Sequence, residues 1–201
     1  ATWVTTGLPG AASVLAASTQ RFKYDVLGQL TETAQLLDAK TDTWSRTRFA
    51  YNERGQKVAT LNELNYLTRY GYDEVGNLAN VLEFADALSP ADSLLFANYQ
   101  APTGKKDREI SYRYDALNRK ISESKTLNLR DISGREYQVY SGTSYKYDAH
   151  GNIVETRDNF NTVNTSRYDS LGRLQSTERS ANGISNAIVH YQRDALGNVV
   201  Q

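Results

Sequence analysis

The sequence predicts an all-β fold built from tandem β-hairpins. Three observations lead to this fold class. A seven-residue string recurs along the chain, the tyrosine that begins it often has a second aromatic residue two positions before it, and turn-forming residues occupy the centre of the string. Tyrosine is also frequent, with 14 Tyr against 5 Phe and 2 Trp in 201 residues. A composition rich in tyrosine favours strands, and glycine between them favours tight turns.

The recurring string has the pattern Y-D-x-x-G-[NQR]-x and occurs seven times. The step from Tyr51 to Tyr72 is 21 residues, and the step from Tyr72 to Tyr114 is 42, which predicts a degenerate copy within residues 90–104. The signature residues are Tyr24, Asp25 and Gly28; Tyr51, Asn52 and Gly55; Tyr72, Asp73 and Gly76; Tyr114, Asp115 and Asn118; Tyr147, Asp148 and Gly151; Tyr168, Asp169 and Gly172; and Asp194 and Gly197, with Arg193 in place of the tyrosine.

Each copy predicts a strand, a turn and a return strand. Aromatic pairs such as Phe22 and Tyr24 alternate with other residues, so both rings point to one face of a strand. The Asp that follows opens a turn, because its carboxylate can accept hydrogen bonds from backbone N–H groups two residues further on. Glycine, or Asn118 in one copy, takes the position that needs a positive φ, and an aliphatic residue starts the return strand.

Two copies depart from the aliphatic rule, with Lys57 and Lys120 where the others have residues such as Leu30. A slip of one residue reverses the faces of a strand, so we expect β-bulges or a return strand that is wetted on both faces. No linker divides the chain. We therefore expect a single array over residues 1–201, part of a longer chain, with an irregular lead-in or cap at 1–20 and insertions at 84–104 and 126–143. The second insertion is a long hairpin or a loop, and Ser89-Pro90 could start a short helix within the first.

Composition excludes several classes of function. Lys and Arg number 23, as do Asp and Glu, and this balance argues against a dedicated nucleic-acid binder or a binder of acidic membranes. There is no apolar run long enough for a membrane span. Cysteine is absent, which excludes disulfides, thiolate zinc sites and cysteine nucleophiles.

No residue in the sequence is marked for catalysis. His150 occupies a turn position that other copies fill with Leu, Arg or Val, and His190 precedes a strand aromatic, so we interpret both as surface residues. The repeated Asp recurs in one local setting, whereas paired-carboxylate mechanisms need two different environments. The spacing of a calcium loop is also missing. We therefore predict no catalytic, cofactor-binding or metal-binding residue, and a protein that is not an enzyme.

The seven strings resemble the RHS, or YD-repeat, family, and the resemblance covers about residues 20–201. It implies hairpins stacked into a curved antiparallel sheet, a segment of a hollow shell-like spiral. In bacterial polymorphic and Tc-type toxins such a shell encloses a toxic domain, and related shells occur in teneurins. The resemblance also implies a bacterial protein that is secreted or lies at the cell surface, delivered by a secretion or toxin complex. The D-P-x-G motif of self-cleaving members is absent, so that activity is not carried over.

The sequence thus favours a structural role, as a non-catalytic segment of a shell that encapsulates and delivers a toxin or effector. The expected partners are neighbouring repeats of the same or a longer chain, a toxin cargo, and further copies that pair through exposed sheet edges. An alternative is an extracellular module that binds carbohydrate or adhesion partners through exposed, tyrosine-rich strand faces. A third reading, a β-repeat enzyme acting on polysaccharides, would need two unlike carboxylates in a cleft.

Overall fold

The computed structural model describes residues 3–6, 19–99, 106–194 and 196–200. Those residues form fourteen strands and one short 3-10 helix. The strands are β1 (Trp3–Thr6), β2 (Gln20–Tyr24), β3 (Leu30–Asp38), β4 (Thr43–Tyr51), β5 (Lys57–Leu61), β6 (Leu67–Tyr72), β7 (Leu78–Glu83), β8 (Arg108–Tyr114), β9 (Lys120–Arg130), β10 (Glu136–Tyr147), β11 (Ile153–Asp158), β12 (Thr162–Tyr168), β13 (Leu174–Ala181) and β14 (Ile184–His190). The helix is η2 (Asp92–Leu94). The predicted all-β fold of tandem hairpins is confirmed.

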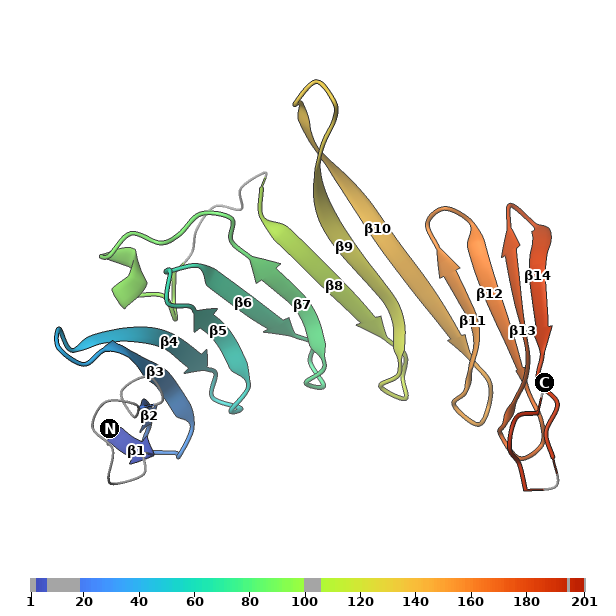
Figure 1. Ribbon diagram of the computed structural model, residues 1–201, viewed down its shortest axis with the longest axis horizontal. Coiled ribbons are helices and arrows are strands. Elements are labelled where there is room, and N and C mark those ends of the chain that lie inside the picture. The colour runs from blue at the N-terminus through green and yellow to red at the C-terminus, as the bar shows by residue number, and fades with distance from the viewer. Residues whose placement is uncertain (1–2, 7–18, 100–105, 195, 201) are drawn as a thin grey trace. The chain divides into compact units, whose positions relative to one another are not determined.

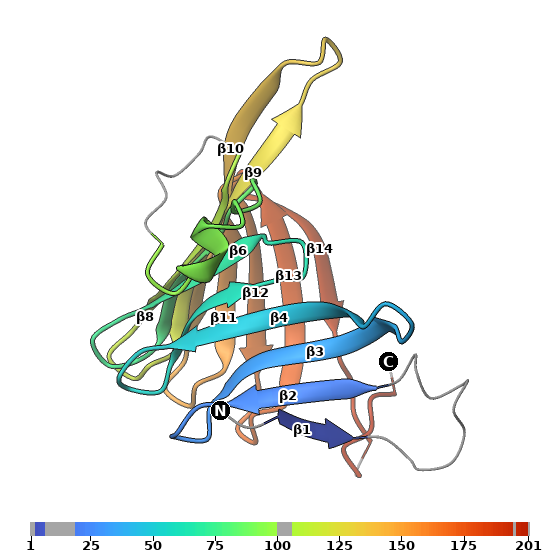
Figure 2. The ribbon, with the colours of Figure 1, turned by 90° about the vertical axis from the view of Figure 1, so that its left-hand side faces the viewer.

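The chain forms two compact units. The first contains residues 1–73 and 80–109, and the second contains 74–79 and 110–201. Strands β1 to β6 pair antiparallel in chain order within the first unit, and Figure 2 shows β1 to β4 side by side. Strands β8 to β14 do the same within the second. Strand order equals chain order because each hairpin pairs with the next one along the sequence.

A β-bulge follows the turn in every hairpin of the repeat whose register is described. Tyr51 pairs with Lys57 and Ala50 pairs with Ala59, so Val58 is an extra residue on the return strand. The same shift accompanies Tyr24, Tyr114, Tyr147 and Tyr168. The bulge predicted for the two lysine copies is confirmed, and it belongs equally to the aliphatic copies. Lysine therefore causes no slip, because Lys57 and Leu30 occupy the same register position.

The core of the first unit lies on one face of β4 to β6. Phe49 and Tyr51 share what we call the aromatic face, so Ala50 between them lies on the opposite face. Leu61 and Leu67 are almost completely buried on that opposite face. The residues that cover them come from the insertion after β7: Phe84 and Leu88 are buried in the same cluster, with Phe96 and Tyr99 packed against it.

The insertion holds no further copy of the repeat in its described part. Residues 90–99 form η2 and turns, in place of the degenerate hairpin predicted there, and residues 100–104 lie outside the described residues. The expected short helix is present as η2, and the Ser89 hydroxyl accepts a hydrogen bond from the amide of its first residue, Asp92, at 3.2 Å. The apolar residues of this segment, such as Phe96, pack against the core cluster instead.

The second insertion forms one long hairpin. Strands β9 and β10 pair from Ser122 and Ser144 out to Arg130 and Glu136. They extend well beyond their neighbours β11 and β12 (Figure 1). Of the two forms that the sequence left open for residues 126–143, the hairpin is the one adopted.

Candidate functional site

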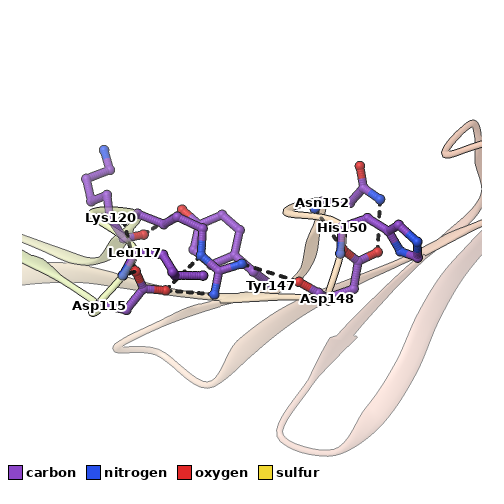
Figure 3. Close-up of polar contacts among 8 residues, drawn as sticks. Asp115, Leu117, Lys120, Tyr147, Asp148, His150 and Asn152 are labelled. Atoms are coloured by element: carbon purple, nitrogen blue, oxygen red, sulfur yellow. Dashed lines mark hydrogen bonds and ion pairs between the residues drawn. The ribbon is translucent and has the colours of Figure 1, made fainter.

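The repeated element of this chain is a set of clamps that hold each turn and join it to the next hairpin. In the turn at Asp148, carboxylate atom Oδ1 accepts hydrogen bonds from the amides of His150 and Asn152, both at 2.9 Å. Gly151 has a φ of 91°, in the left-handed region. Figure 3 shows this turn beside the turn of Asp115. In the single copy without glycine, Asn118 takes the same conformation with a φ of 59°.

In four copies the second carboxylate oxygen is held by the residue that follows the position of positive φ. Asn152 Nδ2 donates to Asp148 Oδ2 at 2.9 Å, and Arg119 Nε donates to Asp115 Oδ2 at 2.8 Å. This donor gives the N and R of the pattern a role that the sequence did not reveal. In the copy of Tyr51, where Asn52 replaces the aspartate, the bond is reversed. The Asn52 side-chain amide donates to the Gln56 side-chain oxygen at 2.8 Å.

In the five copies from Tyr51 to Tyr168, the signature tyrosine ties its hairpin to the one before. Tyr147 donates its hydroxyl to the carbonyl of Lys120 at 2.6 Å. The accepting carbonyl always belongs to the residue that starts the preceding return strand. The other bonds of this kind are Tyr51 to Leu30 (2.9 Å), Tyr72 to Lys57 (2.9 Å), Tyr114 to Leu78 (2.9 Å) and Tyr168 to Ile153 (3.1 Å). We call these bonds the tyrosine clamps.

Arg193 takes over the clamp in the last copy. Its Nη2 donates to the Leu174 carbonyl at 3.2 Å, and its Nη1 donates to the Gly197 carbonyl at 3.1 Å. The copy that departs from the signature at this residue therefore keeps the bond by other means. The requirement at this position is a donor that reaches the preceding hairpin.

The two lysines that break the aliphatic rule lie between aromatic rings. Lys120 Nζ is 5.5 Å from the centre of the Tyr112 ring and 5.2 Å from that of Tyr145. It also forms a 2.7 Å ion pair with Glu123, and the hydrogen bond to that carboxylate raises the pKa of the lysine. Lys57 Nζ lies near Tyr70 and Phe49 in the same way, at 4.8 and 5.7 Å. Cation–π contacts thus replace the aliphatic packing of the other copies.

Hydrogen bonding also sets the charge of the turns. The Asn152 side chain is the main cause of a pKa of Asp148 below its ordinary value, helped by backbone amides. The backbone amide of Arg119 has the corresponding effect on the pKa of Asp115. Burial raises the pKa of Tyr51 and of Tyr72, so these clamp hydroxyls stay protonated and remain donors.

Sequence reasoning missed turns of the same geometry at the other end of the hairpins. Asp158 Oδ1 accepts hydrogen bonds from the amides of Phe160 and Thr162, and Asn161 has a positive φ. Turns built in the same way begin at Asn62 and Asp131. Their signal is Asp or Asn followed three residues later by Gly or Asn, and it was overlooked because no tyrosine precedes it.

The residues considered for catalysis are not brought together with other reactive groups. His150 is exposed at the tip of its turn and His190 is exposed at the end of β14. Among the described residues, His, Asp and Glu form no cluster that could hold a metal ion. Nor does the described part of the chain contain a helix with the length and apolar character needed to cross a membrane.

The fold and the clamps together define a tandem β-hairpin repeat protein. The family model described as RHS Repeat matches residues 147–185, which contain the turns of Asp148 and Asp169. The family resemblance seen in the sequence is therefore confirmed for these residues.

Similar solved structures include the crystal structures titled TcdB2-TccC3-TEV, TcdB2-TccC3-Cdc42 and TcdB2-TccC3. Their sequence identities to this chain are 14%, 14% and 13%, and the TM-scores are 0.47, 0.42 and 0.42. Each alignment covers 90% of this chain but only 10%, 11% and 12% of the other chain, so the chain spans about a tenth of their length. No curated protein matches the chain in sequence.

Proposed function

We propose that this chain is a non-catalytic wall segment of an RHS shell that encloses a toxin or effector and delivers it. The observation that carries the proposal is the series of tyrosine clamps. Each clamp joins a hairpin to its predecessor through a main-chain carbonyl, so the same link can be repeated without limit along a chain. A continuous sheet built in this way can form a barrier between a cargo and its surroundings.

The absence of catalysis is part of the same proposal. The carboxylates that recur along the chain are engaged on both oxygens in copies such as those of Asp148 and Asp194. A general acid or base must be free to exchange a proton with a substrate, whereas these groups accept several hydrogen bonds within their own turns. Their environments are alike from copy to copy, which is the opposite of an acid and base pair.

The proposal extends to the array as a whole. We treat residues 1–201 as one series of repeats within a longer chain, with the signature residues acting as structural clamps. The shell proposal includes a hollow spiral that encloses a toxin cargo. It also includes secretion or surface delivery from a bacterium, and pairing with further copies through sheet edges. The alternative, glycan binding through tyrosine faces, has less support, because the hydroxyls of Tyr51, Tyr72 and Tyr147 are occupied by clamps.

Protease protection in the full-length natural protein tests the shell. A protein that encloses a cargo should protect the segment outside the repeats from an added protease. Replacing Tyr147 and Tyr168 by Phe should shorten the lifetime of that enclosed segment in the presence of the protease, because it loosens two adjacent clamps. Tyr140→Phe is the matched control, because Tyr140 is 69% exposed on the long hairpin and belongs to no clamp. Equal digestion of the cargo in the intact and the clamp-deficient protein, at the rate of the isolated cargo, would contradict encapsulation.

A further inference from the structure

The residue just before the signature position of a copy, which Tyr fills in six copies and Arg193 in the seventh, has a recurring chemistry. It points to the face opposite the signature side chain, because side chains alternate along a strand. In two copies of the first unit this residue is small. Ala50 packs on the cluster that the insertion covers, and a side-chain carbon on Gly71 would collide with Asn80. The seventh copy has Gln192, and in the remaining four copies the residue is basic: Lys23, Arg113, Lys146 and Arg167. All four are basic although the chain has equal numbers of acidic and basic residues.

Three of these basic residues lie on one face of the second unit. Strand pairing runs from Arg113 through β9 to Ser144, which is two residues before Lys146. Pairing then runs from Lys146 through β11 to Thr165, which is two residues before Arg167. Residues opposite one another across strands, and residues two apart along a strand, share a face. The three cations therefore follow one another on β8, β10 and β12.

Only the central cation of the three is neutralised by a neighbouring strand. Lys146 Nζ lies 3.0 Å from Glu155 Oε2 across the pair. Arg113 and Arg167 are opposite Ser122 and Ser176 instead. Both arginines are exposed, and within the described part of the chain neither takes part in an ion pair.

The acidic residues described on the strands beside Arg167 leave it without an ion pair. Glu178 pairs with Thr165 and so lies diagonally from Arg167, without an ion pair between the two in the described structure. Glu155 is shared between Lys146 and Arg157, at 3.0 and 3.5 Å. Among the described residues, the face therefore presents two guanidinium groups without an ion pair, one on each side of the cluster in which Lys146 and Arg157 share Glu155.

We propose that Arg113 and Arg167 are two anchor points for an extended acidic segment of a partner protein. A guanidinium binds a carboxylate through two parallel hydrogen bonds, and both arginines are exposed to an incoming group. Strands β8 and β12 are four strand spacings apart, about 19 Å at ~4.8 Å each, and the pairing places Arg167 four residues further along its strand, about 14 Å at ~3.4 Å each, so the two positions are about 24 Å apart. A polyproline II chain covers that distance in about eight residues at ~3.1 Å each, and it returns to the same side every third residue, so about nine residues bring two side chains to the same side. The partner thus carries two acidic residues about nine positions apart. This inference does not depend on the shell function.

Fluorescence anisotropy with synthetic peptides tests the inference on the 201-residue chain. The probe is a labelled proline-rich peptide with two glutamates nine positions apart, and the comparison peptide has the same composition with adjacent glutamates. The spaced peptide should bind about tenfold more tightly, because only it engages both arginines at once. Arg113→Ala and Arg167→Ala should each remove this preference. Both residues are exposed, so the variants should keep the circular dichroism and melting temperature of the parent chain.

Two further arms give outcomes that would overturn the inference. The variant Lys125→Ala/Arg179→Ala removes two cations that lie on the aromatic face, as their pairing with Ile110 and Asn164 shows. Equal loss of binding in this control would mean a diffuse electrostatic attraction. Equal binding of both peptides, or no binding of either, would also reject the two anchor points. Tight binding of inorganic phosphate or single-stranded DNA that the arginine variants abolish would assign the guanidinium groups to phosphate in place of an acidic peptide.

Discussion

At the scale of single residues, the signature tyrosine has two separate tasks. Its ring packs on the aromatic face, where Phe22 and Phe49 show that a hydroxyl is not needed at the neighbouring position. Its hydroxyl forms the clamp to the preceding hairpin. Phenylalanine cannot form this bond, because it has no hydroxyl. The difference explains why the string begins with Tyr, and why the one exception, Arg193, is another long side chain with hydrogen-bond donors.

The clamp can be measured by removing one oxygen atom. Tyr147→Phe keeps the ring and deletes the bond to the Lys120 carbonyl. We expect the free energy of unfolding to fall by about 0.5–1.5 kcal/mol, the net worth of a typical hydrogen bond. Urea denaturation followed by circular dichroism measures it. Tyr140→Phe should change stability by less, because that side chain is exposed. An equal loss of unfolding free energy in the two variants would show that the clamp adds nothing to stability.

The turn carboxylates make stability depend on acid. Their pKa values are lowered in the folded state, so the unfolded chain binds more protons as the pH falls. The stabilisation is present above the unfolded pKa of ~3.9 and is lost as the pH drops through the lower, folded value.

Changing two of these carboxylates to amides tests the acid dependence. Asp148→Asn/Asp194→Asn should lower stability somewhat at pH 7 but reduce its loss between pH 7 and about pH 3. The turn itself should persist, because the natural copy at Asn52 has an amide and the same backbone bonds. Melting temperatures across that range are the measurement, with Asp86→Asn, at an exposed position outside the repeat turns, as control. An unchanged acid sensitivity in the double variant would rule out these turns as its source.

At the scale of elements, the sequence predicts hairpins well and their surroundings poorly. The turn at Asp148 could be foreseen because all its bonds lie within five residues. The bulges were also foreseeable, from the register conflict at Lys57. The tyrosine clamps were not, because the acceptor is a backbone carbonyl 27 residues away for Tyr147, and carbonyls leave no mark in a sequence. The packing of the insertion after β7 against Leu61 and Leu67 could not be foreseen either, because it depends on contacts between residues far apart in the sequence.

The insertion is expected to stabilise the first unit through its apolar contacts. Leu61 is fully buried beneath it, so Leu61→Ala should cost about 2–5 kcal/mol by loss of burial and creation of a cavity. Leu64→Ala is the matched control in the adjoining turn, where the side chain is 64% exposed, and should have little effect. Thermal unfolding of the two variants provides the comparison. Similar stabilities would mean that the insertion does not seal this face.

At the scale of the whole molecule, stability should be distributed along the chain and not gathered in one centre. Few side chains are buried among the described residues, and the largest fully buried ones are Leu61 and Leu67, both in the first unit. An isolated hairpin is at best marginally stable in water. Each hairpin therefore depends on its sequence neighbours, through strand pairing and clamps, as in other repeat proteins.

Hydrogen exchange can show whether a local change stays local. In a repeat array, the loss of one clamp should raise the opening rate of adjacent hairpins and leave distant ones unaffected. Tyr147→Phe should therefore speed amide exchange in β9 to β11 and leave β3 to β5 unchanged, whereas Leu61→Ala should do the reverse. Exchange measured by mass spectrometry on proteolytic fragments resolves these strands. A uniform acceleration in both variants would mean that the chain opens as a single cooperative body, because every amide would then share one global unfolding step.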